Sequence, residues 1–475
     1  MSATPGHRVP DVGRARLAGR ELGAEIDITG QLRPYEPHRW RPGDTPRPTL
    51  QLDDVSGIPF LVDVAGVEEY QHRGRLRAED HDIYVTVTPE AAGYEPYCRD
   101  TLHMGAPEHL VADPIGPPIA VARACTAGGT HTRLVEAARD AGGLAVHPYM
   151  GIEDVWELAA MLSVDSRTQV RVISPPPPVT WIANDKALFD ELVARVLGRE
   201  ALVETRISRD AAAIETDLRM MAQRHNRVGL KRTRCASAMG NAVFASRDVY
   251  SDRDAAEMVQ EFLCRTEWPD GEDVLTVAWL DTDLSPSTQL WIPPLGSGEP
   301  HLDGIYEQIL KGERKVFVGS RPSTLSDAVN QELATGALMV AAALQELGYV
   351  GRCSFDHLVT GDPNGEFQVV FTECNGRWGG TSTPMTLLDR LLHGPRPAYR
   401  AQDVVFPGLI GASLTDLLEL VGDLVFRAES GHGRFIFYNV GPMHGHGKFA
   451  VISIGEDQDD AERGVLEILP KRLGL

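Results

Sequence analysis

Short segments with the composition of β-strands alternate with amphipathic helical segments through the first 180 residues of the chain. Residues 58–66 and 82–90 are rich in β-branched and other apolar residues, as strands are. Residues 130–143 and 152–162 instead repeat apolar residues at the spacing of one helix face. Alternation of this kind is typical of an α/β layer with a partly parallel sheet, and it predicts that fold class here.

Proline-rich stretches divide the chain. Residues 33–48 contain five prolines and predict an extended arm, and residues 174–180 contain four consecutive prolines and predict a stiff polyproline connector. A weaker break falls at residues 393–400. A single hydrophobic core stops growing at roughly 250–300 residues, so a chain of 475 residues needs more than one domain. We therefore predict domains at residues 1–180, 181–393 and 394–475.

The composition argues against several classes of protein. With 46 basic and 67 acidic side chains the chain has a net charge of −21, and such a surface repels nucleic acid and anionic lipid. The longest apolar run, residues 337–344, is shorter than the ~18 residues of a membrane span, and the first residues lack the apolar segment of a secretory signal. Six cysteines without a CxxC pair argue against a zinc cluster or a disulfide scaffold. We expect a cytoplasmic protein that binds neither nucleic acid nor membranes.

The most specific chemical pattern lies in residues 350–375, where two predicted strands are joined by the turn GDPNG. Period-two alternation places Glu373 and Asn375 on one face of the second strand, and the turn brings Asp356 close to Glu373 across the pair. Two carboxylates and an amide oxygen form a site suited to Mg²⁺. The alternative is a polar hairpin end with a solvated glutamate.

The residues around this pattern suit a negatively charged ligand. Arg377 adds a positive charge where anionic oxygens would gather, and Gly379 and Gly380 allow the backbone to approach a ligand closely. Arg352 lies on the metal-binding face of the first strand, and Thr381 follows the glycines. We expect the substrate to be bound by Arg352, Gly379, Gly380 and Thr381.

A second cluster of charge lies around Lys231. Four basic residues fall within residues 227–234 of an otherwise acidic chain, and Lys231 ends a predicted strand. The residues that follow are small, and this loop, with Ser237 and Gly240, is expected to cover phosphates with its backbone amides. No GKT or GKS motif occurs nearby, so the loop is not a P-loop. The alternative is an exposed basic strand end with an ordinary hairpin turn.

Two further segments have features that suit a nucleotide. Lys186 lies in the first turn of the helix predicted at residues 185–197, where the helix dipole disfavours a cation and an anionic partner would explain it. The strand predicted at residues 273–283 ends in acidic residues. Its edge can offer backbone groups to a purine, with Asp281 or Asp283 near a ribose. The alternatives are a solvated surface lysine and an ordinary core strand.

These features follow one order along the chain: a lysine at a helix start, a lysine at a strand end, a buried strand, and an Asp followed by Glu-x-Asn. In that order the segments NDKALFDEL, VGLKRTRCASAMGNAVF, DVLTVAWL, GYVGRCSFDHLV and ECNGRWGGTS resemble the ATP-grasp superfamily. The last part looks most like the pheganomycin-type peptide ligases, in which an extra domain precedes the ATP-grasp domain and a small domain follows it. The similarity covers residues 181 to about 392.

The resemblance implies an α/β (α+β) architecture: an ATP-grasp fold with an N-terminal α/β pre-ATP-grasp domain and a small C-terminal α+β domain. It also implies that ATP and two Mg²⁺ ions bind in the central domain. The implied contacts are Lys186, Lys231, Ser237, Gly240, Ala278, Leu280 and Asp283 for the nucleotide, Asp356, Glu373 and Asn375 for the metal ions, and Arg377 with Lys231 for the transferring phosphoryl group. The chain departs from the usual pattern at Arg232, where a proline is common, and at Val277, where an acidic residue is common.

The activity implied by the resemblance is that of an ATP- and Mg²⁺-dependent ligase that joins a carboxylate to an amine in a peptide bond. An acyl phosphate would be the intermediate, and the setting would be specialised metabolism such as antibiotic biosynthesis. The expected partners are small-molecule or peptide carboxylates and amines, and a second copy of the chain in a homodimer. The alternatives are an enzyme of the superfamily with a non-amino-acid nucleophile, one that phosphorylates or carboxylates, and a degenerate nucleotide-binding scaffold.

Overall fold

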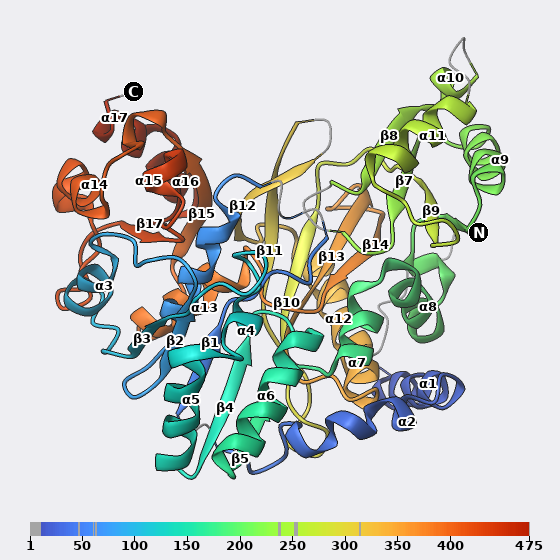
Figure 1. Cartoon of the computed structure of the whole chain (residues 1–475). Coiled ribbons are helices and arrows are strands. Elements are labelled where there is room, and N and C mark those ends of the chain that lie inside the picture. Colours follow the sequence, from blue (N-terminus) through green and yellow to red (C-terminus); the bar gives the residue numbers. More distant parts are fainter. Residues whose placement is uncertain are drawn as a thin grey trace.

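The computed structural model describes residues 11–45, 48–59, 61, 64–235, 239–250, 255–312 and 315–474. The described strands form three sheets. In Figure 1 most of the first 180 residues lie at the bottom of the view, the C-terminal residues lie at the upper left, and the segment from α9 to α11 forms a separate lobe at the upper right. The strands β10 to β14 cross the region between them.

The first sheet is parallel and has five strands in the order β3-β2-β1-β4-β5. Its strands are β1 (Thr49–Leu52), β2 (Ile83–Thr86), β3 (Glu108–Val111), β4 (Gly143–Pro148) and β5 (Gln169–Val172). The helices α4 (Val121–Ala124), α5 (Gly128–Asp140) and α6 (Glu153–Ser166) share a hydrophobic core with it. The α/β layer predicted from the alternating segments is therefore confirmed.

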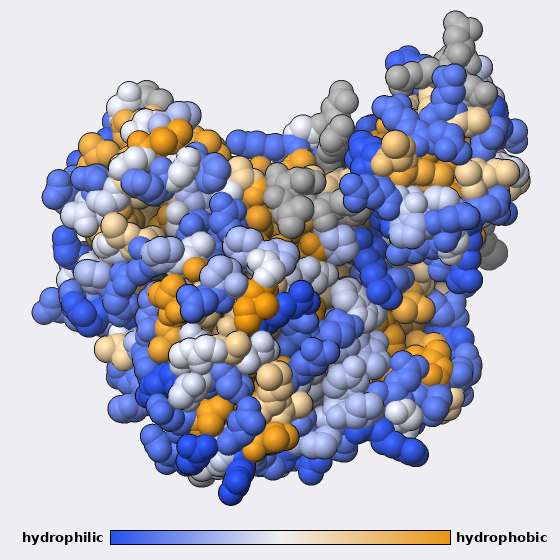
Figure 2. Space-filling view, viewed as in Figure 1, coloured by the Kyte–Doolittle hydropathy of each residue, from blue (hydrophilic) through white to orange (hydrophobic). Residues whose placement is uncertain are grey.

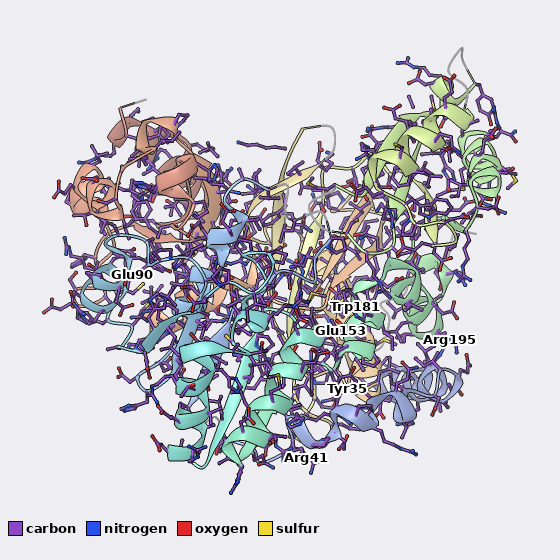
Figure 3. The ribbon with its side chains drawn as sticks, in the orientation of Figure 1. Tyr35, Arg41, Glu90, Glu153, Trp181 and Arg195 are labelled. Carbon is purple, nitrogen blue, oxygen red and sulfur yellow. The ribbon has the colours of Figure 1, made fainter. Side chains whose placement is uncertain are left out.

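Three details of this region differ from the sequence prediction. Residues 58–66 are not a strand where they are described; Leu61 and Val64 instead form successive turns back to the preceding residues. Residues 33–38 form a 3-10 helix rather than an extended arm. Pro177 and Pro178 occupy the first turn of α7 (Pro177–Asn184) instead of continuing a polyproline connector, because the first turn of a helix tolerates residues without an N–H. In Figure 3, Trp181 of α7 lies beside Glu153 of α6, and its indole nitrogen donates a hydrogen bond to the Glu153 carboxylate at 2.8 Å.

The second sheet has eight strands in the order β14-β13-β10-β11-β12-β15-β17-β16, and all of its pairs are antiparallel. Its strands are β10 (Pro286–Ile292), β11 (His301–Lys311), β12 (Val316–Pro322), β13 (Gly351–Gly361), β14 (Phe367–Asn375), β15 (Ala398–Val405), β16 (Phe435–Tyr438) and β17 (Lys448–Gly455). The hairpin predicted at residues 350–375 is confirmed as β13 and β14.

Helices pack on both ends of this sheet. At the β14 end, α1 (Val12–Glu25), α8 (Lys186–Leu197) and α12 (Asp327–Glu346) share a core with β10, β13 and β14. The side chain of Asp185 caps α8 by accepting hydrogen bonds from the N–H groups of Ala187 and Leu188. Gly198 ends the helix at φ 96°, a conformation that favours glycine. The helix predicted at residues 185–197 is thus confirmed.

The β16 end of the second sheet shares a core with several short helices. The helices are α3 (Tyr94–Pro96), α13 (Ser382–Leu391), α14 (Leu414–Val421), α15 (Met443–His446) and α17 (Leu469–Arg472), with α16 (Gln458–Arg463) packed on β17. Of the other short helices, α2 (Ile28–Leu32) follows α1. Among the described helices, none combines the length and the apolar character that a membrane span requires. Figure 2 shows mainly hydrophilic residues on the face in view, with smaller hydrophobic groups between them.

The third sheet is antiparallel and has four strands in the order β6-β9-β7-β8. Its strands are β6 (Thr205–Ser208), β7 (Arg227–Arg232), β8 (Asn241–Ala245) and β9 (Val274–Ala278). The helices α9 (Ala211–Ala222) and α11 (Ala255–Arg265) share a core with it, and α10 (Ser246–Val249) follows β8. This sheet carries both the basic strand end at Lys231 and the buried strand that precedes Leu280.

Candidate active site

A cavity of about 580 Å³ lies where the three parts of the fold meet, and this volume is typical of a small-molecule site. Its lining comes from every region of the chain: Tyr70, Arg73 and Tyr149 from the first 180 residues, Lys231, Ala278 and Leu280 from the third sheet and its exit, Asp356, Glu373 and Asn375 from the hairpin, and Asp403, Asn439 and Lys448 from the C-terminal strands. The cavity therefore contains most of the residues predicted from the sequence and several that were not.

Two carboxylates face one another at the centre of the cavity. Asp356 on β13 lies directly opposite Glu373 on β14 in the strand register. Burial, and then the charge of Glu373, raise the pKa of Asp356 to about 7, although hydrogen bonds from Ser287 and Asn375 oppose this rise. Burial would also raise the pKa of Glu373, but nearby cations hold it below its ordinary value. The pKa values of the two carboxyl groups are thus shifted in opposite directions.

Lys186 supplies the closest of these cations. Its ammonium nitrogen lies 3.1 Å from Oε2 of Glu373 and donates a hydrogen bond of 3.3 Å to the backbone carbonyl of Cys235. The side chain is only 4% exposed. Burial alone would lower the pKa of Lys186, but Cys235 and Glu373 outweigh it and the pKa is raised. The alternative of a solvated surface lysine is therefore wrong.

Lys231 is the second cation, and it lines the cavity directly. Its ammonium group lies 5.4 Å from the ring centroid of Trp279, within cation–π distance. Burial lowers the pKa of Lys231, and Lys186 adds to that effect while Glu373 opposes it. Two of its basic neighbours form ion pairs instead: Arg232 pairs with Glu272, and Arg234 pairs with Asp185. Within the predicted basic cluster, Lys231 is the residue that lines the cavity.

Arg377 connects the end of β14 to the first 180 residues. Its guanidinium donates hydrogen bonds to Asn375 Oδ1 at 2.8 Å and to the Tyr149 hydroxyl at 3.2 Å. Gly376, between Asn375 and Arg377 in the sequence, is held by Asn184, whose Oδ1 accepts a hydrogen bond of 3.0 Å from the Gly376 N–H. The Asn184 amide group also donates to the Gly376 carbonyl at 3.3 Å. These contacts fix the position of Arg377 beside the two carboxylates.

The hairpin residues fit a divalent cation. Among the described residues no group of three His, Cys, Asp or Glu side chains is placed to hold a metal, so any site here consists of two carboxylates and an amide. Lys186 pairs with Glu373, whereas Asp356 has no ion pair among the described residues; a magnesium ion would supply a positive charge next to it. Asn375 donates its amide group to Asp356 Oδ2 at 3.0 Å and accepts from Arg377. Metal binding by Asn375 would therefore use the second lone pair of Oδ1, since Arg377 donates to the first.

The nucleotide contacts predicted from the sequence are only partly brought together. Ala278 and Leu280 line the cavity, and among the described residues the Leu280 N–H has no hydrogen-bond acceptor. Gly240 does not line the cavity, and its carbonyl accepts a hydrogen bond of 2.9 Å from the Arg232 N–H. Ser237 lies outside the described residues. Asp283 pairs with Lys315, its side chain is 94% exposed, and it does not line the cavity.

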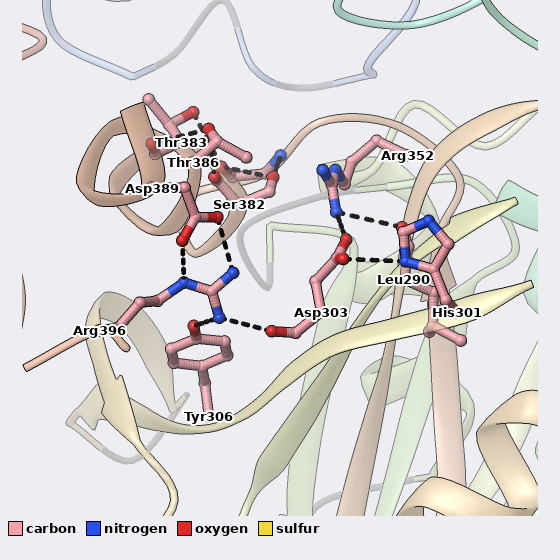
Figure 4. A network of polar contacts seen from close by, with 11 residues as sticks. Leu290, His301, Asp303, Tyr306, Arg352, Ser382, Thr383, Thr386, Asp389 and Arg396 are labelled. Atoms are coloured by element: carbon pink, nitrogen blue, oxygen red, sulfur yellow. Dashed lines mark hydrogen bonds and ion pairs between the residues drawn. The ribbon is translucent and has the colours of Figure 1, made fainter. Parts of the chain in front are cut away.

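The predicted substrate residues also divide into two groups. Gly379, Gly380 and Thr381 line the cavity at the start of α13. A side chain at Gly380 would place its Cβ 2.5 Å from the Phe317 ring, so only glycine fits there without a shift of the ring. Arg352 does not line the cavity. Its guanidinium forms an ion pair with Asp303, as Figure 4 shows. Figure 4 also shows that Asp303 accepts from His301 and that its carbonyl accepts from Arg396.

Several residues of the site were missed by the sequence analysis. Asp190 lies one helical turn after Lys186 on α8, and burial raises its pKa to about 7 against the opposing charges of Lys231 and Lys186. The i, i+4 spacing from Lys186 is a signal that pointed to it. No comparable sequence pattern pointed to Tyr149, Asp403 and Lys448, because their place in the cavity lining depends on how the outer parts of the chain pack.

No protein-family model matches the chain, and no curated protein matches its sequence. Solved structures do match its fold. The N5-carboxyaminoimidazole ribonucleotide synthetase of Thermus thermophilus is 15% identical with a TM-score of 0.52, over 86% of this chain and 96% of that one. The carboxyaminoimidazole ribonucleotide synthase of Aspergillus clavatus, complexed with ATP, is 11% identical with a TM-score of 0.53, over 90% of this chain and 98% of that one.

A third similar structure is the biotin carboxylase domain dimer of Hydrogenobacter thermophilus 2-oxoglutarate carboxylase, in complex with MgADP, ADP and bicarbonate. It is 14% identical with a TM-score of 0.51, over 89% of each chain. These structures are ATP-grasp ligases, and the similarity at such low identity concerns the fold. The ATP-grasp fold, flanked by an N-terminal α/β part and a C-terminal α+β part, is thus confirmed.

Proposed function

We propose that this protein is an ATP-dependent ligase that activates a carboxylate and joins it to an amine in a peptide bond, releasing ADP and phosphate. The observation that carries the proposal is that Lys231, Arg377 and the facing carboxylates Asp356 and Glu373 line one cavity. Lys186 contacts the same Glu373 from outside the cavity lining. The ATP-grasp fold supports it, and so do similar structures that are complexes with ATP or MgADP.

In this proposal the two lysines bind the phosphates of ATP. Lys186 is buried and held as a cation by Glu373, and Lys231 lies on β7 and lines the cavity. The backbone of Ala278 and Leu280 would contact adenine, with the Leu280 N–H as a donor. Asp356, Glu373 and Asn375 would hold magnesium, as one ion or two. When bound, that metal neutralises the charge of the phosphates.

Arg377 is proposed to stabilise the transferring phosphoryl group. A carboxylate does not react with an amine in water, so its oxygen must first attack the γ-phosphorus of ATP, which forms an acyl phosphate and releases ADP. The amine nitrogen then attacks the acyl carbon, phosphate leaves with one carboxylate oxygen, and the nitrogen loses a proton. Both steps depend on positioning and on fixed positive charge, which the cavity supplies through Lys231 and Arg377.

A second candidate is an enzyme that carboxylates a nitrogen nucleophile. The observation that favours it is the set of similar structures, since they include carboxyaminoimidazole ribonucleotide synthetases and a biotin carboxylase domain with bound bicarbonate. Amide formation is the main proposal because the segment ECNGRWGGTS resembles the pheganomycin-type ligases, a peptide-ligase group of specialised metabolism.

One experiment separates the two candidates. The protein is incubated with Mg·ATP and either a pool of amino acids and short peptides or bicarbonate with a pool of amines. ADP release that requires the amino-acid pool, together with a product mass equal to two components minus water, supports the ligase. ADP release that requires bicarbonate supports the carboxylating enzyme. Absence of ADP release in both arms contradicts both candidates.

The organisation of the chain forms part of the same proposal. We retain domains at residues 1–180, 181–393 and 394–475, although the second sheet passes the last boundary through the pairing of Gly319 with Gln402. The biotin carboxylase domain of the third similar structure is described as a dimer, which supports a proposed homodimer here. Light scattering on the purified protein measures that mass directly, and a monomer mass contradicts it. A cytoplasmic location also remains part of the proposal.

A further inference from the structure

The end of the cavity farthest from the third sheet is polar and has no role in the nucleotide or metal site. One side of it consists of Tyr70 and Arg73 from the 3-10 helix η3 (Val67–Leu76). The other side consists of Asp403 on β15, Asn439 after β16 and Lys448 on β17. The two sides are in contact, because the ammonium group of Lys448 donates a hydrogen bond of 2.6 Å to the Tyr70 hydroxyl.

Arg73 provides an unused donor. Its side chain is 9% exposed, and its Nε donates to Asp53 Oδ2 at 3.2 Å and to the Tyr70 carbonyl at 3.0 Å. Within the part of the chain that the structure describes, Nη2 has no hydrogen-bond partner. Arg77 pairs with the same Asp53 carboxylate, so two buried guanidinium groups share one negative charge. A buried donor beside an excess positive charge favours an anionic ligand, above all a carboxylate.

Asn439 and Asp403 provide the opposite chemistry. Asn439 is 5% exposed, and its Oδ1 has no hydrogen-bond partner among the described residues. The Asp403 side chain is 37% exposed and lines the cavity. Its ion pair with Lys448 is long, at 3.4 Å. Burial raises the pKa of Asp403 while Lys448 opposes it. Two oxygen acceptors with incomplete partners favour an ammonium group.

Tyr149 connects this polar end to the centre of the cavity. The guanidinium carbon of Arg73 lies 4.6 Å from the centroid of the Tyr149 ring. The hydroxyl of the same tyrosine accepts the 3.2 Å hydrogen bond from Arg377. Arg73 also lies near enough to Asp403 and Tyr438 to lower the pKa of each against the effect of burial. A ligand held at the polar end is thus next to the arginine that faces the carboxylate pair.

We infer that this end of the cavity binds the zwitterionic head group of an α-amino acid, with its carboxylate against Arg73 and its ammonium group against Asn439 and Asp403. The assignment of that amino acid as the amine substrate rests on the proposed ligase function, whereas its binding does not. A carboxylate held by Arg73 is kept from activation, so the bound amino acid contributes its nitrogen to the new bond.

The test uses calorimetry on the full chain saturated with Mg·ADP. Each of the proteinogenic L-α-amino acids is titrated, and the tightest binder is compared with the matching amine without the carboxylate and the matching acid without the amine. We expect each truncated compound to bind at least about tenfold more weakly, since each loses a charge-assisted contact. If no amino acid binds, or if a truncated compound binds as tightly, the inference is overturned.

Two variants assign the contacts. Arg73→Gln should remove the preference for the amino acid over the matching amine, and Asp53 keeps Arg77 as its partner in that variant. Asn439→Gly should remove the preference over the matching acid; Asn439 has φ 48°, so glycine suits its backbone. Arg99→Ala is the matched control, because Arg99 is exposed and pairs with the adjacent Asp100 away from the cavity. Unchanged preferences in both variants would refute the inference even if the wild type binds amino acids.

The same measurements keep this inference separate from the ligase proposal. Amino-acid binding with the expected preferences, but without ADP release from Mg·ATP, supports the subsite and contradicts the ligase. Ligase turnover that is insensitive to Arg73→Gln and Asn439→Gly contradicts the subsite and leaves the ligase standing. If Arg73→Gln fails to fold, Asn439→Gly tests the ammonium contact independently.

Discussion

The ammonium nitrogen of Lys186 lies 3.1 Å from Oε2 of Glu373, which joins the first turn of α8 to the end of β14. The two residues are far apart in the sequence, and the side chain of Lys186 is 4% exposed while that of Glu373 is 34% exposed. The pairing explains why a lysine is placed in the first turn of a helix, where the dipole disfavours it by a few tenths of a kcal/mol. It also keeps Glu373 ionised beside Asp356, as a metal site requires.

Glu373→Gln should abolish turnover while the fold is retained. The change removes one of two proposed metal-binding carboxylates and the partner of Lys186, but it conserves the shape of the side chain. We expect ADP release to fall by at least about 100-fold, the size of effect that the loss of one preorganised electrostatic contact produces. Rates measured beside far-UV circular dichroism check this. Full activity in a folded variant would exclude the metal site.

Lys231→Met should weaken nucleotide binding by about tenfold or more, because it removes a buried cation from the proposed phosphate site. Calorimetry with ADP in the presence of magnesium measures the dissociation constant. Lys311→Met is the matched control, because Lys311 is exposed and does not line the cavity. Equal affinities in the two variants and the wild type would dismiss the phosphate role of Lys231.

Asn184→Ala should lower kcat with little change in nucleotide affinity. Asn184 holds Gly376 through two hydrogen bonds, and Gly376 lies between Asn375 and Arg377. Without this support Arg377 is misplaced, and small displacements of catalytic groups cost roughly 10- to 100-fold in rate. Asn364→Ala, in the exposed turn between β13 and β14, is the control that should leave kcat unchanged. A wild-type kcat for Asn184→Ala would show that Arg377 is positioned by other contacts.

Stability should fall as the pH drops from about 6.5 to about 4 through His109. Burial, with the nearby charges of His72 and Arg75, lowers the pKa of His109 to about 4. The unfolded chain therefore takes up a proton before the folded protein does, so the contribution of His109 is complete above pH 6.5 and is lost toward pH 4. His109→Phe keeps the ring stacked on Tyr84, with centroids 4.3 Å apart in the wild type, but cannot ionise.

Urea unfolding of the wild type and His109→Phe at pH 7 and pH 5 checks this prediction. The wild type should lose more free energy of unfolding between the two pH values than the variant does. An equal loss in both proteins would show that other groups set the acid sensitivity.

The centre of the site was predictable from the sequence because its geometry is local. Period-two alternation and a short turn were enough to place Asp356 opposite Glu373, and the register of β13 and β14 agrees. The start of α8 was predictable for the same reason, since the capping residue Asp185 and the apolar face are encoded within a few residues. Such features depend on neighbours in the chain rather than on how distant parts pack.

The remaining features depend on packing over long distances. Residues 58–66 have strand composition, but where they are described Leu61 and Val64 form turns, and Ile58, Leu61 and Val64 line the cavity. Arg352 has the right alternation to face the site, yet its guanidinium pairs with Asp303 on β11, which is separated from β13 by β10. No local sequence pattern pointed to Arg73 and Asn439 as cavity residues, because they come together only where the first and last parts of the chain meet.

The most direct test of the central claim follows an oxygen atom. Amino acids and short peptides labelled with ¹⁸O in their carboxylates are incubated with the protein and Mg·ATP, and the released phosphate is analysed by mass spectrometry. Attack of the carboxylate on the γ-phosphorus followed by amide formation predicts that each phosphate carries one ¹⁸O atom and that the nucleotide product is ADP. Unlabelled phosphate, or ¹⁸O in AMP with release of pyrophosphate, would contradict activation through an acyl phosphate.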